Sequence, residues 1–166
     1  ASNKTFRYSL ENSGYGVREI SLEHPVAEDI NIIVLADMRS DFTEEEFRNF
    51  DAYLERGGNL FILGEPKRQQ FMNPVIERLG LRFADGIIVS PSEVNLDDLV
   101  AANIKEGAAK VSENYIRYFR SGYSIMTPSA CAVEVIDSAK GFEITEVLAS
   151  AGKGSWVEKE TTDFIN

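Results

Sequence analysis

The sequence contains little of the residue types that most often build metal sites and nucleophilic active sites. Its 166 residues include one cysteine, Cys131, and one histidine, His24. A single cysteine cannot close an internal disulfide, so it does not identify a redox compartment. One residue of each kind is too few for a zinc site, and we predict neither a metal nor a cofactor. A Cys–His hydrolase is also not expected, because Cys131 lies in an apolar run, where cysteine usually acts as a small hydrophobic residue.

Basic residues are scarce relative to acidic ones. The chain has 17 Lys and Arg against 27 Asp and Glu, which gives a formal net charge of −10. Such a surface repels phosphate backbones and no basic stripe offsets it, so nucleic acid is not an expected partner. No apolar run in the sequence approaches the roughly 18 residues that a membrane-spanning helix needs.

The length and the start of the chain shape what we expect of its organisation. A chain of 166 residues with 43% hydrophobic residues suits a single domain, residues 1–166, with a substantial core. The sequence begins at Ala1 rather than methionine, and no signal-peptide pattern precedes the fold. We therefore expect an excised or processed piece of a longer protein.

Residues 30–64 carry the strongest fold signal. Two short apolar segments flank an amphipathic segment that ends near Arg56. Thr43 and Glu46 fit a capping box at the start of this helix, and Gly57 fits its end. A strand, a helix and a strand in this order form a βαβ unit, whose strands run parallel with a right-handed crossover. We predict a three-layer α/β sandwich with a mostly parallel central sheet, flavodoxin-like or class I amidotransferase-like.

Shorter patterns predict the elements on either side of this unit. A helix is expected over residues 4–12 and a strand over residues 15–22. A second short helix is expected after Asn73, which would cap it, with Pro74 at its first position, where a missing N–H is harmless.

The second half of the chain is read as mainly extended. Residues 81–89 fit either a hairpin or a strand entering a turn, and residues 96–109 fit either a helix or a loop with helical turns. Three further extended segments are predicted: 124–126, 131–136 and 142–149.

Polar residues follow both strands of the βαβ unit. Asp37 and Arg39 come after the first strand, and Glu65, Lys67 and Arg68 come after the second. Ligands of open parallel sheets bind beyond the carboxyl ends of the strands, so these five side chains are the predicted ligand contacts. The alternative interpretation is that they are solvated loop residues and helix caps.

Three other features are weighed as sites. Residues 63–66 stand where a related hydrolase would carry its nucleophile and contain neither Ser nor Cys, so no catalytic residue is predicted. Residues 152–155 resemble part of a phosphate-binding loop but lack its first glycine, and they are interpreted as a turn. Residues 115–120 interleave aromatic and basic side chains, which fits half-buried packing or contact with a sugar or a partner.

Several stretches together resemble the extracytoplasmic domain of gliding-motility-type ABC-transporter auxiliary proteins, which are associated with ABC-2-type transporters. The resemblance combines the strand and helix starts of the βαβ unit, its helix–Gly-Gly–strand piece, and a strand followed by Ser155-Trp156-Val157-Glu158. The stretches that carry it are 32–37, 42–47, 51–60, 73–81, 141–148 and 155–158. It implies a domain at the periplasmic face of the bacterial inner membrane, tethered by helices outside this chain. It implies permease and ATPase subunits as partners of the full-length protein, and it carries no catalytic residue over.

These observations lead to one functional prediction and three alternatives. The predicted role is non-catalytic, in binding a partner or substrate or in assembly, within a bacterial ABC-2-type transporter or gliding-motility system. The alternatives are a carbohydrate-binding module, a degenerate amidotransferase-like hydrolase that uses the crevice near Asp37 and Glu65, and an oligomerisation domain.

Overall fold

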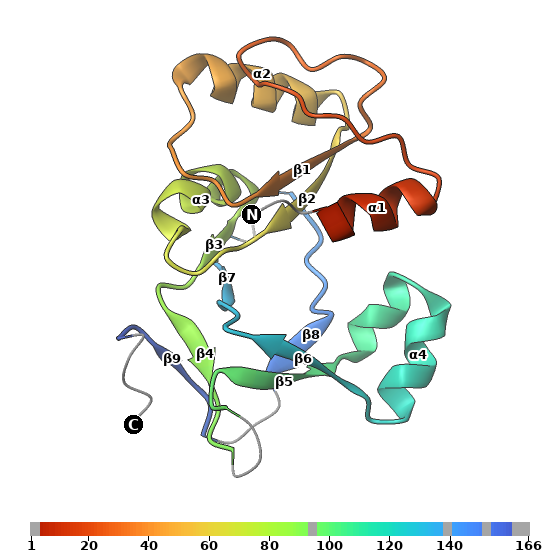
Figure 1. The fold of residues 1–166 in the computed structure, drawn as a ribbon, viewed down its shortest axis with the longest axis vertical. Coiled ribbons are helices and arrows are strands. Elements are labelled where there is room, and N and C mark those ends of the chain that lie inside the picture. Colours follow the sequence, from red (N-terminus) through yellow and green to blue (C-terminus); the bar gives the residue numbers. More distant parts are fainter. Residues whose placement is uncertain (1–3, 93–95, 138–140, 151–153, 161–166) are drawn as a thin grey trace. The chain divides into compact units, whose positions relative to one another are not determined.

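The computed structural model describes residues 4–92, 96–137, 141–150 and 154–160. The chain divides into two compact units, which are described separately (Figure 1). Unit 1 comprises Ala1–Ile33 and Phe42–Phe61, and unit 2 comprises Val34–Asp41 and Ile62–Asn166. The division falls within the first two strands, β1 (Ile32–Ala36) and β2 (Asn59–Leu63), which pair with each other.

The elements of unit 1 follow the sequence signals closely. Helix α1 spans Lys4–Asn12 and helix α2 spans Glu44–Glu55, while β1 and β2 begin in this unit. The predicted capping box is confirmed: the Thr43 hydroxyl accepts from the Glu46 amide at 3.2 Å, and the Glu46 carboxylate accepts from the Thr43 amide at 2.7 Å. Each bond satisfies a backbone donor that has no partner inside the helix. Gly57 follows the helix with a φ of +86°, as predicted for its end.

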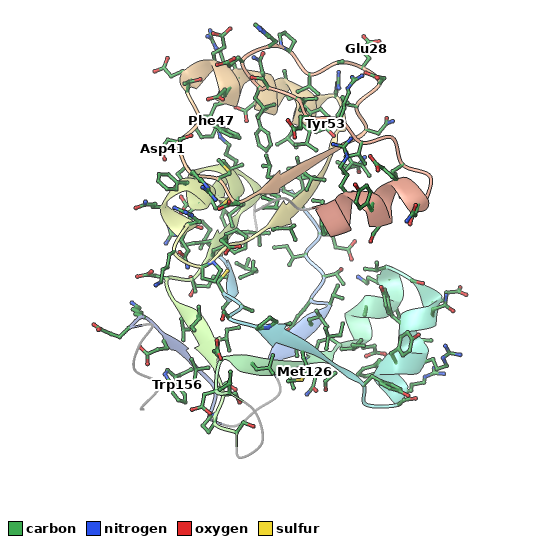
Figure 2. All side chains as sticks on the ribbon, viewed as in Figure 1. Glu28, Asp41, Phe47, Tyr53, Met126 and Trp156 are labelled. Atoms are coloured by element: carbon green, nitrogen blue, oxygen red, sulfur yellow. The ribbon has the colours of Figure 1, made fainter. Side chains whose placement is uncertain are left out.

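The core of unit 1 is built on α2. Phe50 and Tyr53 are its two buried side chains, and Figure 2 labels Tyr53 on this helix. Gly58 passes so close to the Tyr53 ring that a Cβ atom there would lie 2.3 Å from it. Helix α1 contacts β2 through Phe6, whose ring stacks on the exposed ring of Phe61 with 5.7 Å between centroids. Aromatic side chains therefore link both helices to β2 or to the turn before it.

Unit 2 is assembled from short elements. Its helices are α3 (Gln69–Ile76) and α4 (Glu113–Arg120), with two 3₁₀ turns at Glu77–Leu79 and Glu106–Lys110. Its remaining strands are β3 (Leu81–Phe83), β4 (Ile87–Val89), β5 (Leu99–Ile104), β6 (Ser124–Pro128), β7 (Val133–Val135), β8 (Leu148–Ser150) and β9 (Trp156–Glu158). Strand β3 pairs with β7, β4 pairs with β9, and β5 lies between β6 and β8; all four of these pairings are antiparallel.

The prediction of a three-layer sandwich with a mostly parallel, flavodoxin-like or amidotransferase-like sheet is wrong. Among the described residues the strands form four small sheets of two or three strands, most of them antiparallel. The strand–helix–strand unit itself is present as β1, α2 and β2. The prediction failed because it extended the pattern of this one unit to later strands, whose partners lie far along the chain.

Three local predictions also need correction. Residues 15–22 contain no strand. Residues 96–109 contain strand β5 rather than a helix, and the predicted helical turn is limited to the start of the 3₁₀ turn at Glu106–Lys110. Residues 81–89 form two strands that pair with distant segments and not with each other, so they are no hairpin. The predicted extended segment 124–126 lies within β6, and the segment 131–136 contains β7. Of the segment 142–149, only the last two residues are in a strand, at the start of β8.

Helix α3 begins earlier than predicted, and Pro74 lies inside it. Asn73 does not cap the helix, because its side chain bonds both backbone groups of Phe83 in β3. The Asn73 amide donates to the Phe83 carbonyl at 3.1 Å, and its oxygen accepts from the Phe83 amide at 2.9 Å. Asn73 therefore holds strand β3 against the helix with the two hydrogen bonds that a neighbouring strand's backbone would make.

Candidate functional site

Three of the five predicted ligand contacts meet in unit 2, in the loops that follow β1 and β2. Asp37 accepts two bonds from Arg39, from Nε at 3.0 Å and from Nη2 at 2.6 Å, on the same carboxylate oxygen. Nε of Arg68 lies 3.6 Å from the other oxygen. The structure thus brings Asp37, Arg39 and Arg68 together, and we call them the Asp37 cluster.

The other two predicted contacts are not part of the Asp37 cluster. Within the residues that the structure describes, the side chains of Glu65 and Lys67 form no ion pair. Both are exposed; Glu65 lies three residues and Lys67 one residue before Arg68 along the chain.

The backbone of both loops is strained. Asp37 has a φ of +49° and Lys67 a φ of +66°, left-handed values that a side chain disfavours by roughly 1–2 kcal/mol. Across the described residues, Ser129 is the one other non-glycine residue with a positive φ. Strained backbone of this kind is often retained at binding sites, where it fixes the direction of a side chain.

Hydrophobic packing anchors each loop. Met38, between Asp37 and Arg39, packs against a core that includes Met72 and Phe83. After β2, Gly64 lies against the same Phe83 ring, where a Cβ atom would come within 2.5 Å of it. The two loops are therefore held by one aromatic side chain, while their charged ends remain exposed.

The electrostatics of the Asp37 cluster favour an anionic partner. The bonds from Arg39 lower the pKa of the Asp37 carboxyl, against an opposing effect of desolvation, and the charges of Arg39 and Arg68 lower it further. The Asp37 carboxylate in turn raises the pKa of Arg39. One carboxylate between two guanidinium groups leaves a net positive charge, and each guanidinium retains unused donors for a carboxylate or phosphate.

Cys131 lies in the same unit but does not have the properties of a nucleophile. It is half-buried against the core that contains Phe83. Burial raises the pKa of the Cys131 thiol, and the negative charge of Glu65 raises it further. A thiol activated for attack needs a lowered pKa, so this environment works against nucleophilic chemistry at Cys131.

The described part of the chain holds no group of three or more His, Cys, Asp or Glu side chains that could bind a metal ion. In that same part, none of the helices has the length and apolar character required to cross a membrane. Gly152 and Lys153, in the predicted turn at 152–155, lie outside the described residues.

The aromatic and basic cluster at 115–120 lies in α4, where Ile116 and Tyr118 are partly buried and the other four side chains are exposed. Tyr118 packs against Tyr115 at 6.2 Å and against Tyr123 at 5.6 Å between ring centroids. The Arg117 guanidinium lies over the Tyr118 ring, 5.4 Å from its centroid. The rings thus pack at steep angles to one another, as in the packing interpretation of this segment.

Sequence reasoning missed two hollows in unit 1, which lie near the start of β1 and not beyond its carboxyl end. The larger has a volume of about 530 Å³ and is lined by residues 14–18 and 29–32. The smaller, about 230 Å³, shares Ile30 and Asn31 with it and also involves Arg56. The signal that could have indicated the larger hollow is the strand-like pattern of residues 15–22, which has no strand partner in the structure.

Comparison with solved structures supports the fold. The chain resembles a structure described as "mmIFT52 N-terminal domain", with a TM-score of 0.60 and 18% sequence identity. The match covers 87% of this chain and 64% of that one, so the chain spans slightly less than two-thirds of that domain. At this identity the likeness concerns the fold alone, and it supports the mixed architecture over the predicted parallel sandwich.

Comparison by sequence identifies the family. No curated protein matches the chain. A family model described as "ABC-type uncharacterized transport system" matches residues 1–121, which is well over half of the chain and includes the Asp37 cluster. The chain therefore belongs to this family of auxiliary components of ABC-type transport systems.

Proposed function

We propose that this chain is a non-catalytic recognition module of an ABC-type transport system. It acts at the extracytoplasmic face of the bacterial inner membrane, where it holds a partner subunit or a polymeric substrate close to the permease. The observation that carries the proposal is the family match over residues 1–121. The parent protein would be tethered by membrane helices outside this chain, and would assemble with the permease and the ATPase.

The Asp37 cluster is the proposed contact surface. Arg39 and Arg68 are exposed enough to be reached, and Met38 fixes the loop of Arg39 to the core. A carboxylate or phosphate of the partner would take over donors that now face Asp37, so that the arginines exchange one anion for another. Lys67 adds positive charge beside them, whereas Glu65 limits how much negative charge the surface accepts.

The test is co-purification of the full-length protein with the permease and the ATPase from the membranes of the native host. The double variant Arg39→Ala, Arg68→Ala should reduce the recovered permease and ATPase several-fold. Arg82→Ala is the matched control, because Arg82 belongs to the same unit and makes a comparable exposed ion pair with Glu77. Equal recovery from the double variant, the control and the wild type would contradict the role of the cluster.

A second experiment addresses the location and the kind of ligand. Protease added to intact spheroplasts should cleave this domain in the full-length protein, and should leave a cytoplasmic marker intact. Thermal melting of the chain with glycans, nucleotides and short acidic peptides then separates the ligand classes, because a ligand that binds the folded state raises the melting temperature. A domain protected from protease in spheroplasts would refute the extracytoplasmic location.

A further inference from the structure

The larger hollow of unit 1 is a groove beside the first strand. Its lining consists of two chain segments, 14–18 and 29–32, and its volume is about 530 Å³. The segments meet at an ion pair, in which Arg18 Nη2 lies 2.7 Å from Asp29 Oδ1. Away from this ion pair the groove is open along the start of β1.

One wall presents backbone groups without a partner. The carbonyl of Asn31 accepts from the Asn59 amide at 3.2 Å, so Asn31 faces β2. Successive residues of a strand direct their backbone groups to opposite sides, and those of Ile32 therefore face away from β2. The described residues include no other strand beside β1, which leaves this edge open.

The other wall is irregular chain in which the neighbours of Gly16 are bonded, since the Tyr15 amide donates to Leu10 and the Val17 carbonyl accepts from Arg7. No described residue forms a backbone hydrogen bond with Gly16, and a Cβ atom at Gly16 would have nothing within 4 Å. Residues 15–22, which the sequence predicts as a strand, pair with no strand among the described residues. A strand edge that is left open in this way is a template for pairing with another chain.

The side chains and charges of the groove define what fits it. Tyr15 is 54% exposed and Ile32 is 46% exposed, so two large apolar side chains reach solvent from opposite segments. Arg18 and Asp29 neutralise each other within the groove, while the exposed carboxylates of Glu19 and Glu28 follow and precede them in the chain. Figure 2 shows Glu28 at the edge of the unit. Because Arg18 and Asp29 are paired, Glu19 and Glu28 stand at the same end of the groove. An apolar groove with one acidic end matches an apolar strand with one basic end.

We propose that this groove binds an extended peptide segment of a partner protein, with alternating apolar residues and a Lys or Arg at the end that lies beside Glu19 and Glu28. The segment adds a strand to the open edge of β1 by pairing with the backbone of Ile32, and its apolar side chains cover Tyr15 and Ile32. The inference rests on the proposed role in recognising a partner, and it adds a second surface with its own chemistry.

The experiment measures binding of defined peptides to the 166-residue chain by fluorescence anisotropy. The probe is Lys-Val-Thr-Val-Thr-Val-Lys with blocked ends and a fluorescein label. Two matched peptides carry proline in place of the central valine, which removes a backbone donor, or glutamate in place of both lysines. The probe should bind at least tenfold more tightly than either matched peptide, and equal binding of all three would overturn the proposal.

Two variants test the place of binding. Gly16→Trp should fill the groove and abolish binding, whereas Gly16→Ala is the control that adds one methyl group where space is free. Thermal melting of both variants shows whether they fold. In ¹⁵N spectra, the amide of Ile32 should shift and become protected from exchange when the probe is added. Protection of Ile32 together with residues 15–22 before any peptide is added would mean that the chain fills its own groove, and would overturn the proposal.

The two proposals fail separately. Arg39→Ala with Arg68→Ala should leave binding of the peptide probe unchanged, because neither arginine lines the groove. Gly16→Trp in the full-length protein should weaken co-purification with the permease or ATPase beyond any effect of Gly16→Ala. If the peptide probe does not bind but co-purification still depends on Arg39 and Arg68, only the groove proposal is refuted. If the probe binds but co-purification does not depend on the arginines, only the role of the Asp37 cluster is refuted.

Discussion

The phenolic hydroxyl of Tyr53 in α2 donates a 2.8 Å hydrogen bond to the carbonyl oxygen of Asn59, the first residue of β2. This bond spans the Gly57-Gly58 turn, so it fixes the angle at which the helix delivers the chain to the strand. Gly58 lies beneath the ring and leaves no space for a side chain. One buried side chain thus sets both the turn and the start of the strand.

Removing this hydroxyl should destabilise the protein. Tyr53→Phe keeps the buried ring and loses one hydrogen bond, which is worth about 1 kcal/mol in the free energy of unfolding. The matched control is Tyr123→Phe, because Tyr123 is exposed and its ring contact survives the change. Urea denaturation should show a lower midpoint for Tyr53→Phe and an unchanged one for the control. Equal midpoints would show that water replaces the hydroxyl at Asn59 without cost.

The parts of the fold that the sequence predicted correctly depend on neighbours along the chain. The helix over residues 4–12 and the capping box of Thr43 and Glu46 follow from local spacing, and the structure has both. The βαβ order of β1, α2 and β2 is likewise a local signal. Such features can be read from sequence because their partners lie within a few residues.

The parts that failed depend on distant partners. Strands β3 and β7 are three residues each and lie about 50 residues apart, so nothing local indicates that they pair. Asn73 has the residue type of a cap, but its amide bonds to Phe83 instead. Residues 15–22 have the pattern of a strand without the neighbour that would make them one. In each case tertiary contacts outweigh local preference.

The candidate site was predictable in part. The rule that ligands lie beyond the carboxyl ends of strands placed Asp37 and Arg68 together, and they do meet. The same rule did not distinguish them from Lys67, because the direction of each side chain depends on loop backbone angles. It also directed attention away from the groove near the start of β1, where no charged motif marks the sequence.

The Asp37 cluster should make stability depend on pH in the acid range. The folded-state pKa of Asp37 is lowered mainly by its bonds from Arg39, so the ionised carboxylate stabilises the folded state. This contribution is complete above the unfolded-state pKa, about 4, and is lost as the pH falls through the lower folded-state value. Asp37→Asn removes it and keeps a residue that tolerates the positive φ.

Urea denaturation from pH 7 to pH 2 measures this contribution. The midpoint of the wild type should exceed that of Asp37→Asn near neutral pH, and the two should converge as the pH falls below about 4. Asp41→Asn is the control for the change of carboxylate to amide, since Asp41 is exposed and forms no ion pair among the described residues. A difference between wild type and Asp37→Asn that stays constant down to pH 2 would contradict the ion pair with Arg39.

Cys131 should react slowly with thiol reagents. Burial raises the pKa of its thiol and the charge of Glu65 adds to the effect, so little thiolate is present at neutral pH. Labelling by a disulfide reagent at pH 8 should be slower in the folded protein than in guanidinium. Glu65→Gln should increase the rate in the folded protein without altering it in the unfolded one. A folded rate equal to the unfolded rate would show that the thiol is neither buried nor shifted.

Gly86 should be among the glycines least tolerant of substitution, because two independent costs combine there. Its φ is +107°, and a Cβ atom would lie 2.1 Å from the carbonyl oxygen of Glu158 in β9. Gly122 has a φ of +66° and nothing within 4 Å of such an atom, so it carries the backbone cost alone. Gly122→Ala should therefore cost roughly 1–2 kcal/mol in unfolding free energy. Gly86→Ala should cost clearly more, because backbone atoms cannot move aside without breaking the β4–β9 pairing.

The comparison of these two variants separates the cost of backbone strain from the cost of steric overlap. Urea midpoints give the two free energies, and hydrogen exchange at Val89 and Trp156 reports whether β4 and β9 remain paired, because the Ile88 amide donates to the Ala130 carbonyl instead. Exchange at both positions should accelerate in Gly86→Ala and stay slow in Gly122→Ala. Equal destabilisation by the two substitutions would mean that the approach of Gly86 to Glu158 does not hold β9 in place. The Ser-Trp-Val-Glu stretch would then owe its position to other contacts, such as the 3.1 Å bond between the Ser155 and Ser90 hydroxyls.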